Sequence, residues 1–276
     1  MGALALLAAA AIALPGFHVA RAEPGGGTLL QGTVPDAQIA QPLNSGFVYL
    51  PPGFTTARRY PVVYLLHGMP GSPMEYAHGL GLLDWADSQI EAGKLEPFIA
   101  VVPSAAQKTS AEWAGVWEDY VVHGVVPWVD AHLPTIASPA GRVLAGLSAG
   151  GYGAADIGLR NPGVFGRIAS WSGYFHPLRD GPFKNADSAT LRANDPWIII
   201  HSDLAKLRAA GLAFFLSTGP PHSHWEQPAE TLSFAATLRR LGFPVRVMTF
   251  QSARGHWGSE FHAGLTWAFG HAGAGN

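Results

Sequence analysis

The chain contains no cysteine, and only 13% of its 276 residues are charged. Without cysteine it cannot form disulfide bonds, bind metal ions through thiolates or use a cysteine nucleophile. The low charge accompanies 48% hydrophobic residues, a composition opposite to that of disordered chains. A formal net charge of -2 gives no basic excess that would favour nucleic acid or anionic lipid. The composition therefore favours a globular domain with a large core.

Two common motifs for cofactor and metal sites are also missing. The sequence has no G-x-x-x-x-G-K-[ST] motif, which excludes a P-loop, and no H-E-x-x-H motif. His222 and His224 are separated by one residue, a spacing that could ligate zinc. No third ligand stands in a supporting pattern, so we interpret this stretch as a solvated loop. We predict neither a metal nor another cofactor, and no nucleic-acid partner.

The first 22 residues are typical of a secretory signal peptide. Residues 3–14 form one apolar run, which is shorter than the roughly 20 residues that a membrane-spanning helix needs. Ala20-Arg21-Ala22 matches the small-x-small cleavage pattern. No Lys or Arg precedes the apolar run, so an uncleaved membrane anchor and a buried N-terminal helix stay open as alternatives. We predict a protein that is secreted or held in the cell envelope.

Strand-like and helix-like stretches alternate after a flexible Gly-rich linker at residues 23–27. Short apolar runs predict buried strands at residues 47–50, 61–66, 98–102, 142–145, 167–171, 213–216 and 245–250. Helical spacing of apolar or small residues predicts helices at residues 80–92, 119–132, 149–160 and 229–241. We therefore predict a single α/β domain with a mostly parallel sheet over residues 45–276. Residues 23–44 would form the linker and an N-terminal edge strand, whereas residues 174–212 fit neither strand nor lid clearly.

A nucleophilic serine is predicted at the turn that joins residues 142–145 to residues 149–160. Gly146-Leu147-Ser148-Ala149-Gly150 fits the motif G-x-S-x-G in the strand-to-helix context that the motif requires. Such a turn is so tight that the residues two positions before and after the serine must be glycine. The N-terminus of the following helix offers backbone N–H groups to a developing oxyanion. In this context, a plain glycine-rich turn with a structural serine is the weaker interpretation.

The loop after the strand at residues 61–66 should supply a second oxyanion donor. We predict the backbone N–H of Met69 for this role, together with that of Ala149, because Pro70 has no N–H to donate. His67 also lies in this loop. It stands far upstream of the position expected for a catalytic base, so we expect it to brace the loop.

The general base should follow the last strand of such a sheet. His256 lies 108 residues beyond Ser148 and just after the strand at residues 245–250. Since a serine hydroxyl is a poor nucleophile until a base removes its proton, we predict that His256 serves Ser148. His18, in the leader, and His262 and His271, near the C-terminus, are poorer candidates.

An Asp or Glu between Ser148 and His256 should orient the histidine and stabilise its imidazolium form. Glu226 is the first carboxylate after the strand at residues 213–216, and we predict it as this acid. Glu230, Asp203 or no acid at all are the alternatives. A solvated capping carboxylate is the other interpretation of Glu226.

An ordered set of motifs between residues 50 and 173 resembles the putative-esterase family of α/β-hydrolases. The motifs are Leu50-Pro51-Pro52-Gly53, Tyr60-Pro61-Val62-Val63-Tyr64-Leu65-Leu66-His67-Gly68, Trp117-Glu118-Asp119-Tyr120, Gly146-Leu147-Ser148-Ala149-Gly150-Gly151-Tyr152-Gly153, Asn161-Pro162-Gly163-Val164-Phe165 and Ser172-Gly173. The resemblance weakens over residues 174–212 and returns at residues 214–219 and at Gly255-His256-Trp257. Antigen 85 mycolyltransferases, feruloyl-type esterases and S-formylglutathione hydrolase belong to this family.

The resemblance implies an α/β-hydrolase fold and a serine hydrolase or acyltransferase that needs no cofactor. It implies Ser148 as the nucleophile, His256 as the base, and oxyanion donors at Met69 and Ala149. It also places the acid in the loop that contains Glu226. The predicted substrate-binding residues are Trp117, Tyr152 and Trp257. Trp117 fits a half-buried core aromatic equally well.

We therefore expect an exported carboxylic-ester hydrolase that acts on a small-molecule or lipid ester. An acyltransferase that uses the same site is the first alternative, because water and an alcohol can both accept the acyl group. A non-catalytic relative that binds a cell-envelope ligand is the second. A membrane is a partner only if the N-terminal segment stays uncleaved.

Overall fold

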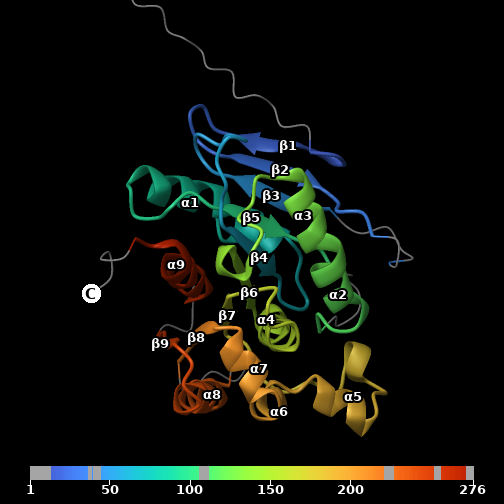
Figure 1. Cartoon of the computed structure of the whole chain (residues 1–276). Helices are drawn as coiled ribbons and strands as arrows, with labels where there is room; N and C mark the ends of the chain where they lie inside the picture. Colours follow the sequence, from blue (N-terminus) through green and yellow to red (C-terminus); the bar gives the residue numbers. More distant parts are fainter. Residues whose placement is uncertain are drawn as a thin grey trace, which may run out of the picture.

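A nine-stranded sheet forms the centre of the protein in the computed structural model, which describes residues 14–36, 39, 45–105, 112–220, 227–251 and 256–271 (Figure 1). The strands are β1 (Phe17–Ala22), β2 (Thr28–Gly32), β3 (Gly46–Leu50), β4 (Val62–Leu66), β5 (Ile99–Val102), β6 (Arg142–Leu147), β7 (Arg167–Trp171), β8 (Ala213–Thr218) and β9 (Val245–Thr249). Their order is β1-β2-β3-β5-β4-β6-β7-β8-β9. The pairs from β5 to β9 are parallel, and the pairs that involve β1, β2 or β3 are antiparallel. The predicted mostly parallel sheet is confirmed.

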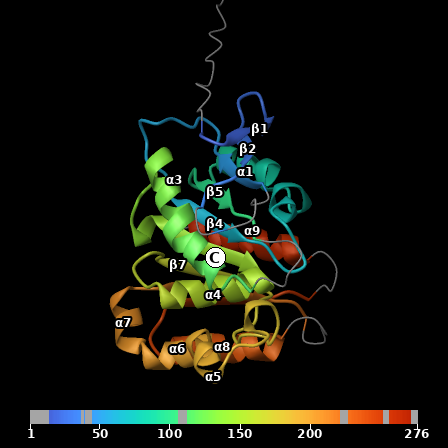
Figure 2. The same ribbon diagram turned by 90° about the vertical axis from the view of Figure 1, so that its right-hand side faces the viewer.

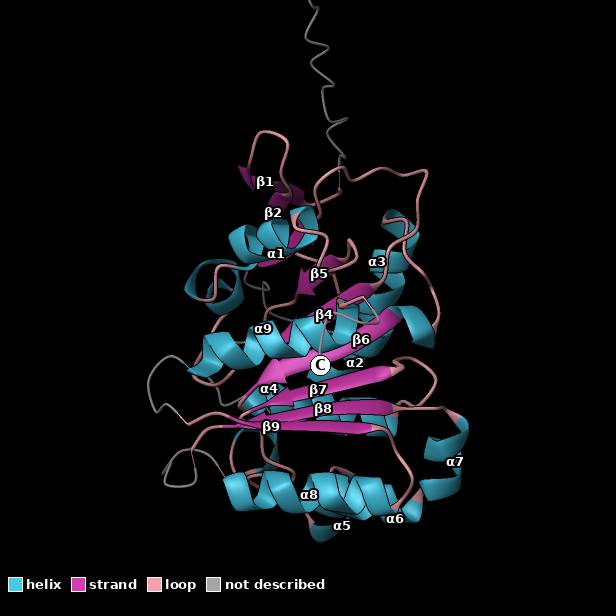
Figure 3. Ribbon diagram, turned by 90° about the vertical axis from the view of Figure 1, so that its left-hand side faces the viewer, coloured by secondary structure: helices cyan, strands magenta, loops and turns pink. Residues whose placement is uncertain are grey.

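Helices cover both faces of this sheet. They are α1 (Leu82–Glu91), α2 (Val116–Asp119), α3 (Val126–His132), α4 (Ala149–Arg160), α5 (Ser188–Ala193), α6 (Pro196–Ser202), α7 (Leu204–Ala209), α8 (Pro228–Arg240) and α9 (His256–Phe269). Two π-helical segments, Glu75–Gly79 and Tyr120–Val125, precede α1 and α3. Figure 2 shows α3, α4, α6 and α8 on one face, and Figure 3 shows α1 and α9 on the other.

Strand β4 shows why the central strands are continuous apolar runs. All five of its residues are fully buried. Val62, Tyr64 and Leu66 pack against the face covered by α4 and α8, whereas Val63 and Leu65 pack against the face covered by α1 and α9. A strand between two helical layers has no solvent-facing side, so every position is apolar.

Residues 174–212, which the sequence left unassigned, contain the helices α5, α6 and α7. The apolar stretch Trp197–Ile200 belongs to α6 and is not a strand. Helix α6 begins there because the Asp195 side chain accepts hydrogen bonds from the N–H groups of Trp197 and Ile198, and Pro196 occupies the first turn. The predicted helix over residues 119–132 is likewise divided between the end of α2, a π-helical segment and α3.

The Gly-rich residues 23–27, predicted as a flexible linker, form the turn of the β1–β2 hairpin. Asp87 of α1 fixes this turn: its carboxylate accepts the Gly27 N–H at 2.6 Å and the Tyr49 hydroxyl at 2.7 Å. The buried acceptor on α1 therefore orders a segment whose composition alone predicts flexibility. Residues 37, 38 and 40–44 of the predicted linker lie outside the described residues.

Part of the predicted leader takes part in the sheet. Residues 1–13 lie outside the described residues, whereas Leu14 is buried and Phe17–Ala22 form β1. Strand β1 is an edge strand that pairs with β2, and its last five residues are exposed. Cleavage after Ala22 would remove it and leave β2 as the edge. Within the described ranges, no helix combines the length and hydropathy that crossing a membrane requires.

Candidate active site

Ser148 stands at the sharp turn between β6 and α4, with φ 55° and ψ -116°. This conformation is strained for a residue with a side chain. A Cβ atom at Gly146 would overlap the carbonyl oxygen of Gly150, and one at Gly150 would overlap that of Leu66. The Ser148 N–H donates to the Trp171 carbonyl oxygen at 2.9 Å, which ties the turn to β7. The structure thus has the glycine-flanked serine turn that the motif predicts.

The first turn of α4 lies directly beside this serine. Ala149 is the first residue of the helix and is buried. Backbone N–H groups in a first turn have no acceptor within their own helix, and the helix dipole places partial positive charge there. The Ala149 N–H therefore belongs to a helix end suited to an oxyanion.

The loop after β4 also lies close to Ser148. A Cβ atom built on Gly68 would lie 3.4 Å from the Ser148 Cβ. Met69, the predicted donor, is the next residue and is half-buried. The two predicted oxyanion donors, Met69 and Ala149, thus lie on segments that both adjoin the serine.

His67 braces this loop, as expected from its position in the sequence. It is fully buried, and its Nε2 accepts the Ala105 N–H at 3.2 Å. The neutral ring then carries its proton on Nδ1, which lies 2.9 Å from the Gly68 carbonyl oxygen. Burial lowers the pKa of His67 to about 4, so the ring stays neutral near pH 7. The Trp113 indole N–H donates to the His67 carbonyl oxygen at 2.9 Å and secures the backbone.

His256 is the first residue of α9 and is buried. Helix α9 packs on β7 and β8. One turn after His256, the Glu260 carboxylate accepts the Ser172 hydroxyl at 2.7 Å. Ser172 directly follows Trp171, whose carbonyl oxygen holds the Ser148 N–H. These contacts bring the first turn of α9 close to the C-terminal ends of β6 and β7, where Ser148 stands.

Glu260 has a fully buried carboxylate that none of the motifs above predicts. The available signal was its position four residues after His256, which places the two side chains on the same face of a helix. A buried carboxylate needs strong hydrogen bonds to offset its loss of hydration, and Ser172 provides one. Ser172 itself has a positive φ of 46°.

The candidate acids occupy different places. Glu226, the predicted one, lies outside the described residues, as do His222 and His224. Glu230 lies in the first turn of α8, where its Oε1 accepts hydrogen bonds from the Phe175 N–H at 3.3 Å and the Trp197 indole at 3.2 Å. These contacts engage Glu230 with residues 175–197. Helix α8 also covers the face of the sheet opposite α9, the helix that begins with His256.

Asp203 is the wrong candidate on geometric grounds. It caps the end of α6 and lines a cavity together with Arg160, the last residue of α4. Helix α4 has 12 residues, so this end lies roughly 18 Å from Ser148. A residue there cannot orient a histidine that serves Ser148.

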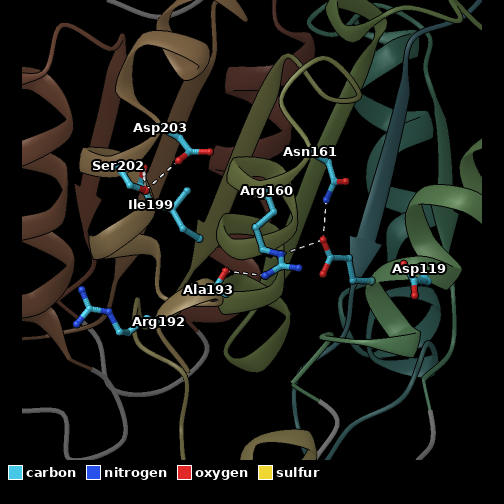
Figure 4. Close-up of a pocket in the computed structure, with 9 residues that line it drawn as sticks. Asp119, Arg160, Asn161, Arg192, Ala193, Ile199, Ser202 and Asp203 are labelled. Carbon is cyan, nitrogen blue, oxygen red and sulfur yellow. Dashed lines mark hydrogen bonds and ion pairs between the residues drawn. The ribbon is translucent and has the colours of Figure 1, made fainter. Parts of the chain in front are cut away.

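The cavity at the far end of α4 has a volume of about 480 Å³ (Figure 4). Within its lining, Glu118 accepts hydrogen bonds from Arg160 at 3.1 Å and from Asn161 at 2.8 Å. Within the described ranges, no group of three or more His, Asp or Glu side chains could hold a metal ion.

The three predicted substrate-binding aromatics have different environments. Trp257 is 48% exposed and follows His256 directly, with their ring centroids 6.0 Å apart. Trp117 is half-buried and packs against the core. Tyr152 is fully buried, and its hydroxyl donates to the Asn194 carbonyl oxygen at 2.7 Å. Tyr152 lies one helical turn beyond Ser148, with its hydroxyl on Asn194 at the end of α5, and its role in binding substrate stays a prediction.

Comparison with known proteins identifies relatives of one kind. The family model described as "Putative esterase" matches residues 44–268. An esterase of Mycobacterium tuberculosis is 33% identical over 143 residues, which cover 48% of this chain and 30% of that protein. An endo-1,4-beta-xylanase/feruloyl esterase of Xylanibacter ruminicola is 32% identical over 145 residues, 46% of this chain and 19% of that protein. The matched region thus spans less than a third of these relatives.

Solved structures agree on the fold. A ferulic acid esterase superposes with a TM-score of 0.76 at 21% identity, covering 88% of this chain and 97% of its own. An S-formylglutathione hydrolase from Staphylococcus aureus gives a TM-score of 0.70 at 16% identity, covering 91% and 99%. The sheet and its two helical layers form an α/β-hydrolase fold, as predicted.

Proposed function

The chain belongs to the putative esterase family, and from that premise we propose that it hydrolyses carboxylic esters through an acyl-enzyme on Ser148. The observation that carries this proposal is the strained Ser148, held between the loop at Gly68 and the first turn of α4. Strain at a residue with a side chain persists only where the surrounding structure enforces it, and it gathers at functional sites.

In the proposed reaction, the Ser148 hydroxyl oxygen attacks the ester carbonyl carbon while His256 takes the hydroxyl proton. The backbone N–H groups of Met69 and Ala149 donate to the oxyanion of the tetrahedral intermediate, and donors of this kind are typically worth about 3–4 kcal/mol each. Collapse of the intermediate releases the alcohol, which His256 protonates. His256 then removes a proton from water, and the resulting attack frees the acid and restores Ser148.

Two further parts of the proposal concern the acid and the place of action. Glu226 remains our proposed partner for His256, because it follows β8 in the position that the fold assigns to the acid. Export to the cell envelope or medium rests on the apolar run over residues 3–14 and on Ala20–Ala22. For the substrate we propose a small-molecule or lipid ester, with the exposed Trp257 beside it.

Hydrolysis of p-nitrophenyl acetate, butyrate and octanoate by the full chain tests the proposal. We expect turnover that falls by at least about 10³-fold in Ser148→Ala, and an unchanged melting temperature would show that the variant is folded. Trp257→Ala should change the preference among the three chain lengths more than it changes turnover of the acetate.

Other outcomes would redirect the assignment. A folded wild type that a fluorophosphonate labels at Ser148, but that releases acyl groups only when an alcohol is added, would be an acyltransferase. A folded wild type that neither turns over nor is labelled would be a binding protein. Equal turnover by wild type and Ser148→Ala would contradict the serine mechanism.

A further inference from the structure

We propose that Glu75 is a positioning residue for this reaction: its carboxyl group holds the Gly68 N–H and so fixes the loop that presents the Met69 N–H to the oxyanion. The inference rests on the proposed function. It assigns a role to a partly buried carboxyl group that the mechanism above does not use.

Glu75 reaches the loop from the first residue of the π-helical segment Glu75–Gly79. Its Oε2 accepts the Gly68 N–H at 3.2 Å. The same oxygen would lie 3.4 Å from a Cβ atom on Gly71 and 3.9 Å from one on Gly68. The carboxyl group is thus seated against the turn formed by residues 68–71.

That turn includes a residue that lies against the nucleophile. A Cβ atom on Gly68 would lie 3.4 Å from the Ser148 Cβ, and Met69 is the next residue. Because Glu75 takes the Gly68 N–H, the neighbouring N–H, that of Met69, is the one left for the substrate. Oxyanion donors act only when they are held where the charge develops, so a small displacement of this peptide costs rate.

The environment of Glu75 indicates that its side chain acts as a hydrogen-bond acceptor and does not merely fill space. Burial raises the pKa of the Glu75 carboxyl, and the hydrogen bond from Gly68 opposes that rise. Burying a carboxyl group costs free energy that an apolar side chain of similar size would not. The position therefore demands an acceptor, which a glutamine also supplies through its carbonyl oxygen.

The remainder of the loop is held independently of Glu75. Trp113 and Ala105 donate to His67 at its carbonyl oxygen and at its Nε2. Tyr76, fully buried, donates its hydroxyl to the Leu66 carbonyl oxygen at 2.9 Å. Loss of the Glu75 carboxyl should consequently release the peptide at Gly68 without unfolding the protein.

The experiment measures kcat and KM for p-nitrophenyl acetate in the full-length wild type, Glu75→Ala, Glu75→Gln and Glu75→Asp. We expect kcat to fall about 10- to 100-fold in the alanine and aspartate variants, below the 10²–10³-fold cost of deleting a donor outright, with KM within about threefold. Glutamine keeps the length and the acceptor, so its kcat should stay within about threefold of wild type. Glu91→Ala, at an exposed position on α1, is the matched control and should be unchanged.

The proposal is overturned if Glu75→Ala or Glu75→Asp keeps wild-type kcat, or if glutamine is impaired as strongly as they are. Should Glu75→Ala fail to fold, the comparison between the folded aspartate and glutamine variants decides, since they separate geometry from charge. Wild type and Ser148→Ala run in the same assay. Absent turnover in the wild type would count against the proposed function, whereas active wild type with indifferent Glu75 variants would count against this inference alone.

Discussion

The two ends of helix α4 differ in almost every respect. At its start, Ser148 has a positive φ, and the glycines two residues away on each side lie against backbone that no Cβ could approach. At its end, Arg160 and Asn161 line a cavity of about 480 Å³, and both donate hydrogen bonds to Glu118. The proposed chemistry lies at the start of α4, which we call the crowded end, whereas the cavity lies at the other end.

The two ends of α4 allow two indicators of a functional site to be compared, namely cavity volume and backbone strain. A large concave pocket is the usual first guess for a binding site. Here the hydrogen bonds of Arg160 to Glu118 and to the Ala193 carbonyl oxygen engage this arginine and this glutamate within the protein. Strain at Ser148, by contrast, has no structural explanation of its own, because an unstrained turn could also join a strand to a helix. At Ser148 the backbone strain coincides with the motif that the proposed reaction uses, whereas the cavity lies at the other end of the helix.

The largest expected effect comes from adding a methyl group at the crowded end. In Gly150→Ala the new Cβ would overlap the Leu66 carbonyl oxygen, so β4 and α4 must separate. We expect a loss of about 3 kcal/mol or more in the free energy of unfolding, and loss of ester turnover in any protein that still folds. Chemical denaturation and the p-nitrophenyl acetate assay measure both.

Gly258→Ala is the matched control for this prediction. Gly258 lies within α9, and a Cβ atom there would meet nothing within 4 Å. Alanine favours a helix over glycine by about 1 kcal/mol, so this variant should be as stable as wild type or slightly more so. Normal stability of Gly150→Ala would contradict the crowding argument.

The same contrast explains which parts of the structure the sequence could predict. The bounds predicted for α4 and β7, residues 149–160 and 167–171, agree with the structure. Local patterns decide these elements: an apolar run buried on both faces, and a turn that only glycine permits. The order of Ser148 and His256 along the chain likewise indicated that both follow strands of one parallel sheet.

Features that depend on contacts between distant residues could not be predicted. The bond between Ser172 and Glu260 joins residues 88 positions apart, and the spacing of Glu260 from His256 indicates a shared helix face but not this partner. The hydroxyl of Tyr152 donates to the carbonyl oxygen of Asn194, in a region whose helices the sequence did not assign, so this contact could not be predicted either. The structure leaves the identity of the acid as a prediction, since Glu226 lies outside the described residues.

A smaller effect is expected from Asp156, in the middle of α4. It is fully buried, and neither of its carboxyl oxygens has a hydrogen-bond partner within the described part of the chain. Burial raises its pKa well above the ordinary value. The unfolded chain therefore loses this proton at lower pH than the folded protein does, and stability falls as the pH rises above about 4.

Asp156→Asn should remove this pH-dependent penalty. Its free energy of unfolding should match that of wild type below about pH 4 and exceed it at pH 7, by a difference that grows as the pH rises, because asparagine cannot ionise. Urea denaturation across this pH range measures the difference, and Asp119→Asn at an exposed site should show none. A gain that is the same at every pH would disprove the role of ionisation.

The smallest effect is expected at the far end, from Arg160→Ala. This change removes the hydrogen bonds of Arg160 to Glu118 and to the Ala193 carbonyl oxygen, while Asn161 still donates to Glu118. We expect a loss of about 1–2 kcal/mol in the free energy of unfolding, with kcat for p-nitrophenyl acetate within about twofold of wild type. Arg192→Ala, an exposed arginine on the same cavity, should change stability by less than about 0.5 kcal/mol. A large fall in kcat with Arg160→Ala would connect the cavity to the chemistry and overturn the contrast between the two ends of α4.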